Sequence, residues 1–294
     1  FMHVKHSNLD RFILGVNYIV LTLAVLIIVV PLGYIVIASF MDPTVLLSKG
    51  LSFRISDWSV EGYRKILSNP AMLRGFANSV FYSSCFALIS VTVSICAGYA
   101  LSVNSLVGRN FFMTLFIITM FFSGGLIPTY LLVKNLGMLD TVWAILLPGA
   151  INVWDLILAR TFFKGVPNEL KEAANVDGAS DWTIFFRIVL PLSKPIIFVI
   201  ALYAFVGQWN SYFDAMIYLD NAQLHPLQLV LRSILIQNQT MPGMISDQLA
   251  MAELKRLSEM IKYSSIVISS LPLLVMYPFF QKYFEKGVMV GSLK

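Results

Sequence analysis

The sequence has little charge for its length. Only 13% of its 294 residues are Asp, Glu, Lys or Arg, about half the ~25% that is typical of a soluble domain. Hydrophobic residues make up 57% of the chain, and the mean hydropathy is +0.76. A soluble protein of this composition would have too little polar surface to cover itself. The composition therefore argues against a disordered chain and a soluble enzyme, and favours a protein that crosses a membrane several times.

Cysteine and reactive motifs are scarce as well. The two cysteines, Cys85 and Cys96, share one apolar run, and a helix would hold them about 16 Å apart at ~1.5 Å per residue, too far for a disulfide. The sequence contains no GxxxxGK[ST] phosphate-binding loop, and no metal cluster, nucleophile–base pair or carboxylate dyad stands out. His3, His6 and His225 lie in end or loop segments. We therefore expect no catalytic residue, no metal ligand and no cofactor bound by this chain.

Long apolar runs are what the sequence does have. Each of six runs is near the ~20 residues that a membrane-spanning helix needs. The fourth contains Asp155 and the fifth contains Asp214, while Gly124-Gly125 and Pro128 either break the third or let another helix pack closely. We predict an all-α protein with six transmembrane helices in one membrane domain, residues 1–294. The runs are Tyr18–Phe40, Ala77–Leu101, Phe111–Leu132, Thr141–Ala159, Pro195–Tyr218 and Ser264–Phe280.

The distribution of basic residues indicates the orientation in the membrane. An even number of spans puts both termini on one side. With cytoplasmic termini, the inner segments hold 11 of the 21 Lys and Arg in roughly 69 residues, and the outer loops hold 10 in roughly 91. This margin favours cytoplasmic termini, a cytoplasmic loop at 160–194 and a long outer loop at 219–262. Since the basic residues form no run or stripe, no nucleic-acid partner is expected.

The loop between the fourth and fifth runs, residues 165–195, carries the clearest local pattern. Pro167 suits the first turn of a helix. Gly178 can end that helix because glycine readily adopts the left-handed conformation. Ser180 can cap a second helix, which Pro191 ends. The sequence thus predicts a rigid elbow of two short helices with a polar, small-residue tip.

This elbow resembles the EAA loop of the permease subunits of ATP-binding-cassette (ABC) importers. The resemblance rests on Glu172-Ala173-Ala174, Asp177-Gly178-Ala179 and Ile188 with Leu190-Pro191, at the family's spacing. It extends over most of the chain through Asn78-Ser79, the LGMLDT segment at 136–141, the WNSYF segment at 209–213 and the C-terminal FFQKYFEKGVMVGSLK. Together these are similar to the second, smaller subunit of the carbohydrate-uptake, maltose-permease-like branch, closest to transporters of oligosaccharides and polysaccharide fragments. An alginate-type transporter and a simple disaccharide permease both fit.

The resemblance implies a type I ABC importer permease fold and a division of labour between subunits. The chain would import a carbohydrate, most readily an oligosaccharide, by alternating access, in the inner membrane with both termini cytoplasmic. Its partners would be a second homologous permease, two cytoplasmic ATPase subunits that use ATP and Mg²⁺, an external or periplasmic substrate-binding protein and membrane lipid. The residues expected to couple the chain to the ATPase are Glu172, Ala173, Ala174, Asp177, Gly178, Leu190 and Pro191.

Polar side chains within the spans are candidates for the substrate pathway, because burying them in a membrane is costly. Asp155 fits a pathway role or a pairing with a neighbouring span. Trp209, Asn210 and Tyr212 combine stacking rings with the hydrogen-bonding groups that a sugar requires, although Trp and Tyr also anchor spans at membrane interfaces. Asp214 fits a structural or loop-capping role.

Three other readings stay open at this point. A secondary transporter would need charged relays within its spans, which are sparse here. An ABC permease for a solute other than a sugar would share the same elbow. An intramembrane enzyme would need a converging nucleophile or metal site in the spans.

Overall fold

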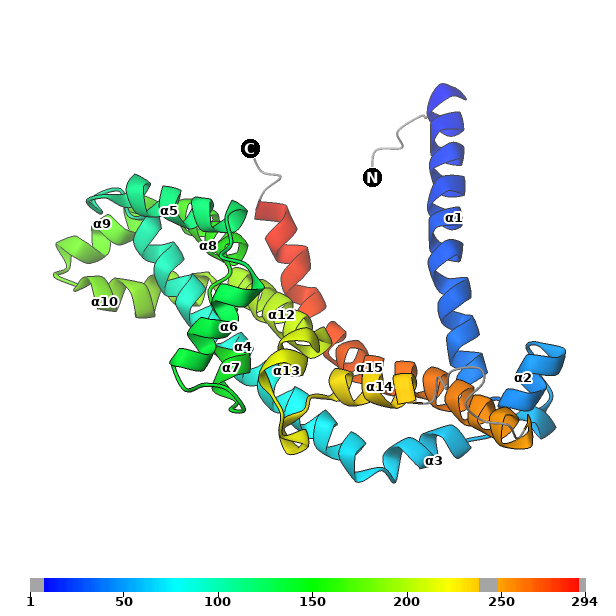
Figure 1. Ribbon diagram of the computed structural model, residues 1–294. Coiled ribbons are helices and arrows are strands. Elements are labelled where there is room, and N and C mark those ends of the chain that lie inside the picture. The colour runs from blue at the N-terminus through cyan, green and yellow to red at the C-terminus, as the bar shows by residue number, and fades with distance from the viewer. Residues whose placement is uncertain (1–7, 238–247, 291–294) are drawn as a thin grey trace. The chain divides into compact units, whose positions relative to one another are not determined.

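The computed structural model describes residues 8–237 and 248–290, and almost all of them are helical (Figure 1). Within these ranges there is no regular strand, only an isolated bridge between Met41 and Trp58. The all-α fold expected from the sequence is therefore confirmed. By their contacts the residues group into two compact units, residues 1–69 with 234–270 and residues 70–233 with 271–294.

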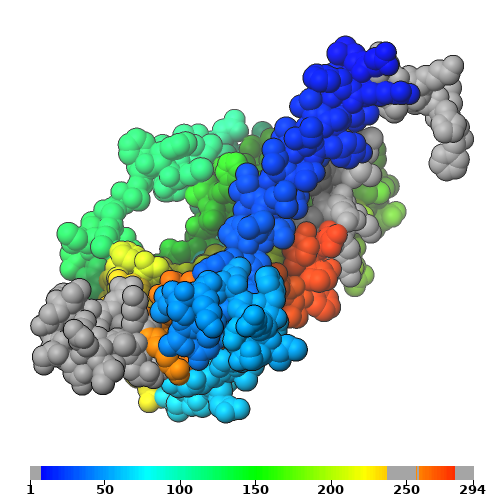
Figure 2. Space-filling view, turned by 90° about the vertical axis from the view of Figure 1, so that its right-hand side faces the viewer, coloured from blue at the N-terminus to red at the C-terminus, as the bar shows by residue number. Residues whose placement is uncertain are grey.

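The first unit contains a long apolar helix, α1. Large hydrophobic side chains are exposed along almost its whole length (Figure 2, dark blue). A surface of this kind is stable against lipid rather than water. The other helical elements of this unit are short, apart from the first part of α15. The bounds are α1 (Asn8–Ser39), α2 (Pro43–Lys49), a 3₁₀ turn (Ile55–Asp57), α3 (Glu61–Leu67) and α15 (Gln248–Val290), which runs on into the second unit.

An ionic cluster ties α15 to the two short helices of the first unit. The Arg256 guanidinium lies 3.6 Å from the Asp42 carboxylate and 3.2 Å from that of Glu61. Burial alone would raise the pKa of Asp42, but hydrogen bonds from Thr44 and the charge of Arg256 outweigh it and lower that pKa. Asp42 also accepts a hydrogen bond from the Thr44 N–H at 2.8 Å as the N-cap of α2.

The second unit is built around α4 (Pro70–Ser102), which packs along α8 (Val153–Lys164) and α12 (Lys194–Asn210). Buried serines line α4, and small side chains of this kind let neighbouring helices approach closely. The remaining helices are α5 (Arg109–Phe121), α6 (Leu126–Asn135), α7 (Trp143–Leu146), α9 (Asn168–Val176), α10 (Asp181–Ile184), α11 (Leu190–Leu192), α13 (Phe213–Tyr218) and α14 (Leu227–Gln237), with a π turn (Phe185–Val189) and a 3₁₀ turn (Ala222–Leu224). The last residues of α14, from Ile234 onward, belong to the first unit.

Three described helices are long and apolar enough to cross a membrane: residues 8–39, 70–102 and 258–281. Two bent pairs raise this to five if each pair is one span, residues 109–121 with 126–135 at 113° and residues 181–192 with 194–210 at 76°. The break in the third apolar run occurs at Gly124-Gly125, as the sequence allowed, and Gly125 has a φ of 84°. The count of six spans stays a prediction.

The fourth apolar run, Thr141–Ala159, does not form the continuous helix predicted for it. It contains the four-residue helix α7, a non-helical stretch over residues 147–152 and the start of α8. Pro148 lacks the N–H that a helix needs, and Gly149 follows directly. A hydropathy pattern registers composition and is insensitive to such a break.

Candidate functional site

The predicted elbow is present as a helix–turn–helix. Helix α9 ends at Val176 with Asp177 as its C-cap, and Gly178 follows with a φ of 76°. Ser180 caps α10 by accepting a hydrogen bond from the Thr183 N–H at 3.3 Å. The helical segment then continues through the π turn to Leu192 and bends into α12 at Ser193. The turn at Gly178 and the cap at Ser180 are thus confirmed in the backbone. Pro191 does not end the second helix as predicted, because it lies inside the helical segment that continues to Leu192, and Pro167 is the N-cap of α9 rather than part of its first turn.

The elbow has an inner and an outer face. Ala174 is buried in a hydrophobic cluster with Ile95, Phe163 and Phe185. The side chains proposed for coupling are otherwise mostly accessible: Glu172, Ala173, Asp177, Gly178 and Pro191 are exposed, while Leu190 is half-buried.

Large apolar side chains are exposed beside these polar residues. Val176 is 88% exposed and Trp182 is 71% exposed, and the Trp182 ring stacks on Phe186 with centroids 5.7 Å apart. An exposed apolar patch beside a carboxylate on a rigid turn has the features of a protein-binding surface.

Side chains from α9 and the π turn connect the elbow to the end of α4. The Lys171 ammonium lies 5.8 Å from the centroid of the Tyr99 ring, and burial lowers the pKa of Lys171. The Tyr99 ring also packs 5.6 Å from Phe163 and 4.7 Å from Phe185. A cleft of about 880 Å³ lies between the elbow and residues 102–107, and Lys171 and Asp181 are among its polar lining residues.

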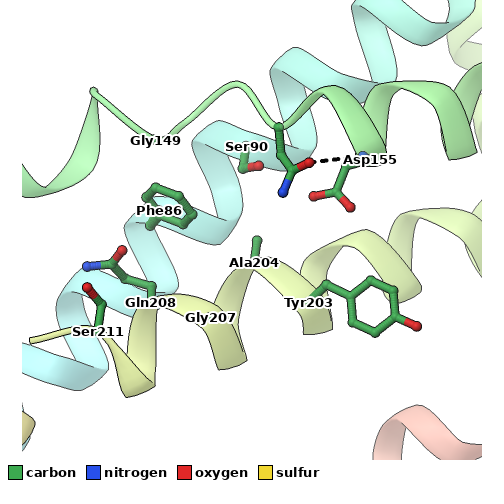
Figure 3. A pocket seen from close by; sticks show the side chains of 10 residues that line it. Phe86, Ser90, Gly149, Asp155, Tyr203, Ala204, Gly207, Gln208 and Ser211 are labelled. Carbon is green, nitrogen blue, oxygen red and sulfur yellow. Dashed lines mark hydrogen bonds between the residues drawn. The ribbon is translucent and has the colours of Figure 1, made fainter. Parts of the chain in front are cut away.

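A second candidate site is a polar cavity of about 230 Å³ among α4, α8, α12 and the segment before α8 (Figure 3). Its wall contains several uncharged polar side chains and one carboxylate, but no basic side chain. Glycine and alanine on α12 leave the space open. The lining residues are Phe86, Ser90, Gly149, Asn152, Asp155, Tyr203, Ala204, Gly207, Gln208 and Ser211.

Asp155 is the charged group of this cavity. It is only 3% exposed, and its carboxylate projects from α8 toward α12 (Figure 3). The Asn152 carboxamide oxygen accepts from the backbone N–H of Asp155 at 3.3 Å and so caps α8. No hydrogen bond or ion pair to the Asp155 carboxylate is formed by the part of the chain that the structure describes. The Ser90 hydroxyl is buried and likewise lacks a partner among those residues.

The other three predicted pathway residues do not line this cavity. Trp209 is fully buried, with its ring between Phe76 and Phe205. The Asn210 carboxamide donates to the Val206 carbonyl at 3.0 Å. Their pathway role, like that of Tyr212, stays a prediction.

Tyr212 lies on the exposed side of its segment. Its ring is 39% exposed and lies 5.3 Å from the Arg232 guanidinium. This arrangement is a cation–π contact and leaves the ring available at the surface.

Sequence reasoning did not single out the cavity residues on α12. Ala204, Gly207 and Gln208 recur at i, i+3 and i+4, so one face of α12 carries small and polar residues, and Ser211 directly follows the helix. The neighbouring aromatic residues Trp209 and Tyr212 were predicted to line the pathway instead. The sequence signal for this cavity was therefore a row of small and polar residues along one face of a helix. Such a row carries no charge and does not stand out within an apolar run.

Comparisons with known proteins agree over nearly the whole chain. Residues 105–290 match the family described as "Binding-protein-dependent transport system inner membrane component". The chain is 39% identical to a polygalacturonan/rhamnogalacturonan transport system permease protein of Bacillus subtilis strain 168, over 99% of this chain and 100% of that protein. It is 29% identical to an arabinooligosaccharides transport system permease protein of Halalkalibacterium halodurans, over 91% and 92% of the two chains.

A solved structure is similar as well. A chain of a bacterial ABC transporter involved in the import of the acidic polysaccharide alginate has a TM-score of 0.82 and 30% identity to this chain. The similarity covers 96% of this chain and 99% of that chain.

Proposed function

Because the chain belongs to the family of inner-membrane components of binding-protein-dependent transport systems, we propose that it is the permease subunit of an ABC importer for oligosaccharides. It is a multi-pass membrane protein, and its family is a transport component rather than an enzyme. The observation that carries the proposal is the elbow between α8 and α12, a capped helix–turn–helix with an exposed carboxylate and exposed apolar side chains. Such a surface suits a subunit whose movement is driven by a separate ATPase subunit bound to it.

The substrate class that we propose is oligosaccharide fragments of an acidic polysaccharide. The similar permease of Bacillus subtilis is named for polygalacturonan and rhamnogalacturonan, and the similar solved structure is of an alginate importer. Polygalacturonan and alginate are both chains of uronic acids, so each sugar unit carries a carboxylate. The likeness extends over almost the full length of this chain in both cases.

The proposed assembly contains a second permease, two cytoplasmic ATPases and an external substrate-binding protein, with both termini of this chain in the cytoplasm. Glu172, Ala173, Asp177 and Gly178 would contact an ATPase, since they are exposed on one tip. Ala174 would support that tip from the hydrophobic cluster beneath it. Leu190 and Pro191 would shape the stem that leads into α12.

ATP and Mg²⁺ would act in the ATPase, and this chain would convert the resulting movement into a change of access. Such coupling requires the ATPase to bind the inward-open and outward-open states with different free energies. The cluster of Ala174, Phe163 and Phe185 joins the elbow to the ends of α4 and α8. A displacement of the tip would thereby reach the helices that surround the polar cavity.

Glu172→Lys tests the coupling role directly. Reversing the charge on the exposed tip should abolish uptake by the assembled transporter and reduce copurification of the ATPase, while insertion into the membrane stays normal. Asp220→Lys reverses an exposed acid elsewhere in the same unit and is the matched control. Normal ATPase copurification and normal transport in Glu172→Lys would refute the coupling assignment.

A further inference from the structure

Building on the proposed function, we propose that the cavity among α4, α8 and α12 binds one sugar unit by its uncharged hydroxyl edge. In this arrangement the Asp155 carboxylate accepts hydrogen bonds from sugar hydroxyls, and the uronate carboxylate of the substrate points away from this chain. The cavity would therefore select the orientation of the sugar in the pathway.

The size of the cavity matches a single ring. Its volume of about 230 Å³ corresponds to roughly eight water molecules at ~30 Å³ each. This is below the ~300–1,000 Å³ of pockets that enclose a larger ligand. An oligosaccharide would therefore place one unit at a time in this cavity.

The buried polar groups of the cavity require a partner. Asp155 is 3% exposed and Ser90 is 1% exposed. The Ser90 hydroxyl has no hydrogen-bond partner within the described residues, and the Asp155 carboxylate, which lines the cavity, receives no hydrogen bond or ion pair from them. Unsatisfied polar groups inside a membrane protein are costly, and an unpaired charge is more so. A bound ligand with several hydroxyls would relieve both, because each hydroxyl can donate and accept.

The lining suits the two kinds of surface that a sugar ring presents. Asn152 lies beside Asp155, whereas Gln208 and Ser211 lie together at the other end of the lining (Figure 3), and all three side chains can exchange hydrogen bonds with sugar hydroxyls. Phe86, on the α4 side of the cavity (Figure 3), offers an apolar wall for the C–H face of a ring. The small Gly207 on α12 leaves room between these walls.

The charge of the lining determines which edge of the sugar faces it. Asp155 carries the only carboxylate among the lining residues, and none of them is Lys, Arg or His. Two negative charges close together repel strongly where the surroundings have a low dielectric constant. A uronate carboxylate would therefore be disfavoured here, whereas its ring hydroxyls would be accepted.

The test compares uptake of a galacturonate trimer with that of its carboxyl-reduced, neutral galactose trimer by the assembled transporter in proteoliposomes. Asp155→Asn keeps the size of the side chain and removes its charge. Because one binding protein delivers both sugars to every variant, a change in the uptake ratio comes from the permease. The ratio of anionic to neutral uptake should rise at least about threefold.

Asp214→Asn is the matched control for the charge. It makes the same chemical change in the first turn of α13, outside the cavity lining, and should leave the ratio at the wild-type value. An unchanged ratio in Asp155→Asn would overturn this inference. Loss of the second permease when Asp155→Asn is purified would overturn it too, since the carboxylate would then pair across the subunit interface. If wild-type transporter imported neither trimer, the proposed substrate class itself would fail.

A second pair of variants tests the hydroxyl contact. Ser90 and Ser94 are both buried on α4 with unpartnered hydroxyls in the described structure, but only Ser90 lines the cavity. Ser90→Ala should raise the half-saturating sugar concentration about threefold to tenfold through the loss of one hydrogen bond. Ser94→Ala should leave the half-saturating sugar concentration unchanged. Equal effects of the two substitutions would contradict a sugar contact at Ser90.

Discussion

At the scale of single residues, Gly178 determines the geometry of the elbow. Its φ of 76° lies in the left-handed region, and a Cβ there would meet nothing within 4 Å. Substitution therefore carries a backbone cost, about 1–2 kcal/mol for an ordinary residue, without a steric clash. Gly178→Val should shift the turn and lower ATP-driven uptake by roughly tenfold or more, measured in proteoliposomes.

Gly178→Asn is the control for that substitution. Asparagine adopts the left-handed conformation more readily than other residues with a Cβ, so this variant should retain most of the uptake. If the valine and asparagine variants transported equally well, the backbone conformation of the turn would not be what limits coupling.

The residues that sequence reasoning identified at this scale are those with a local or electrostatic signal. Pro167, Gly178 and Ser180 act through backbone conformation and capping, which depend on neighbours in the chain. Asp155 was found because a charge in an apolar run is conspicuous. Ser90 was not found, since its place in the cavity depends on how α4 packs against other helices.

At the scale of helices, close packing of α4 on α8 connects the elbow to the cavity. A Cβ on Gly98 would lie 2.7 Å from the Ala159 Cβ, so the helices would have to separate. Gly98→Ala should destabilise the protein by about 1–3 kcal/mol, measured as a lower thermal unfolding midpoint in detergent. The Arg160 side chain also donates a hydrogen bond to the Leu101 carbonyl at 3.0 Å across this contact. Separating the two helices would strain this bond as well, so uptake should fall.

A matched control is available on another part of the same unit. At Gly124 the added Cβ would lie 3.7 Å from the Pro128 Cβ, an ordinary contact distance. Gly124→Ala should therefore leave the unfolding midpoint close to that of the wild type. A Gly98→Ala variant with the same midpoint as Gly124→Ala would show that α4 and α8 are not tightly packed at this point.

Helix type was predictable from the sequence to a greater extent than helix continuity. The apolar runs indicated membrane helices because burial in lipid dominates their free energy. The break at residues 147–152 and the 113° bend between α5 and α6 depend on Pro148, Gly149 and Gly125. Such residues are tolerated where neighbouring helices satisfy the freed backbone groups, and that condition is set by tertiary packing.

At the scale of the whole molecule, the chain divides its surface between lipid and partners. Large apolar side chains are exposed along α1, as expected of a helix in lipid. The elbow instead exposes Glu172 and Asp177 beside Val176 and Trp182. Nine of the 37 charged residues lie between residues 160 and 194, and exposed charged and apolar side chains meet at this one turn, which indicates where another protein is expected to bind.

This arrangement predicts that another subunit supplies the free energy for transport by hydrolysing ATP. The full sequence has no GxxxxGK[ST] loop to hold the phosphates of ATP, so the purified chain should show no ATP hydrolysis above background in a phosphate-release assay. Adding the second permease, the two ATPases and a sugar-loaded binding protein should produce hydrolysis and uptake together. In the same assembly, Glu172→Lys in this chain should abolish the uptake. Sustained ATP turnover by the purified chain alone would contradict a permease role, because the motor would then reside in this chain.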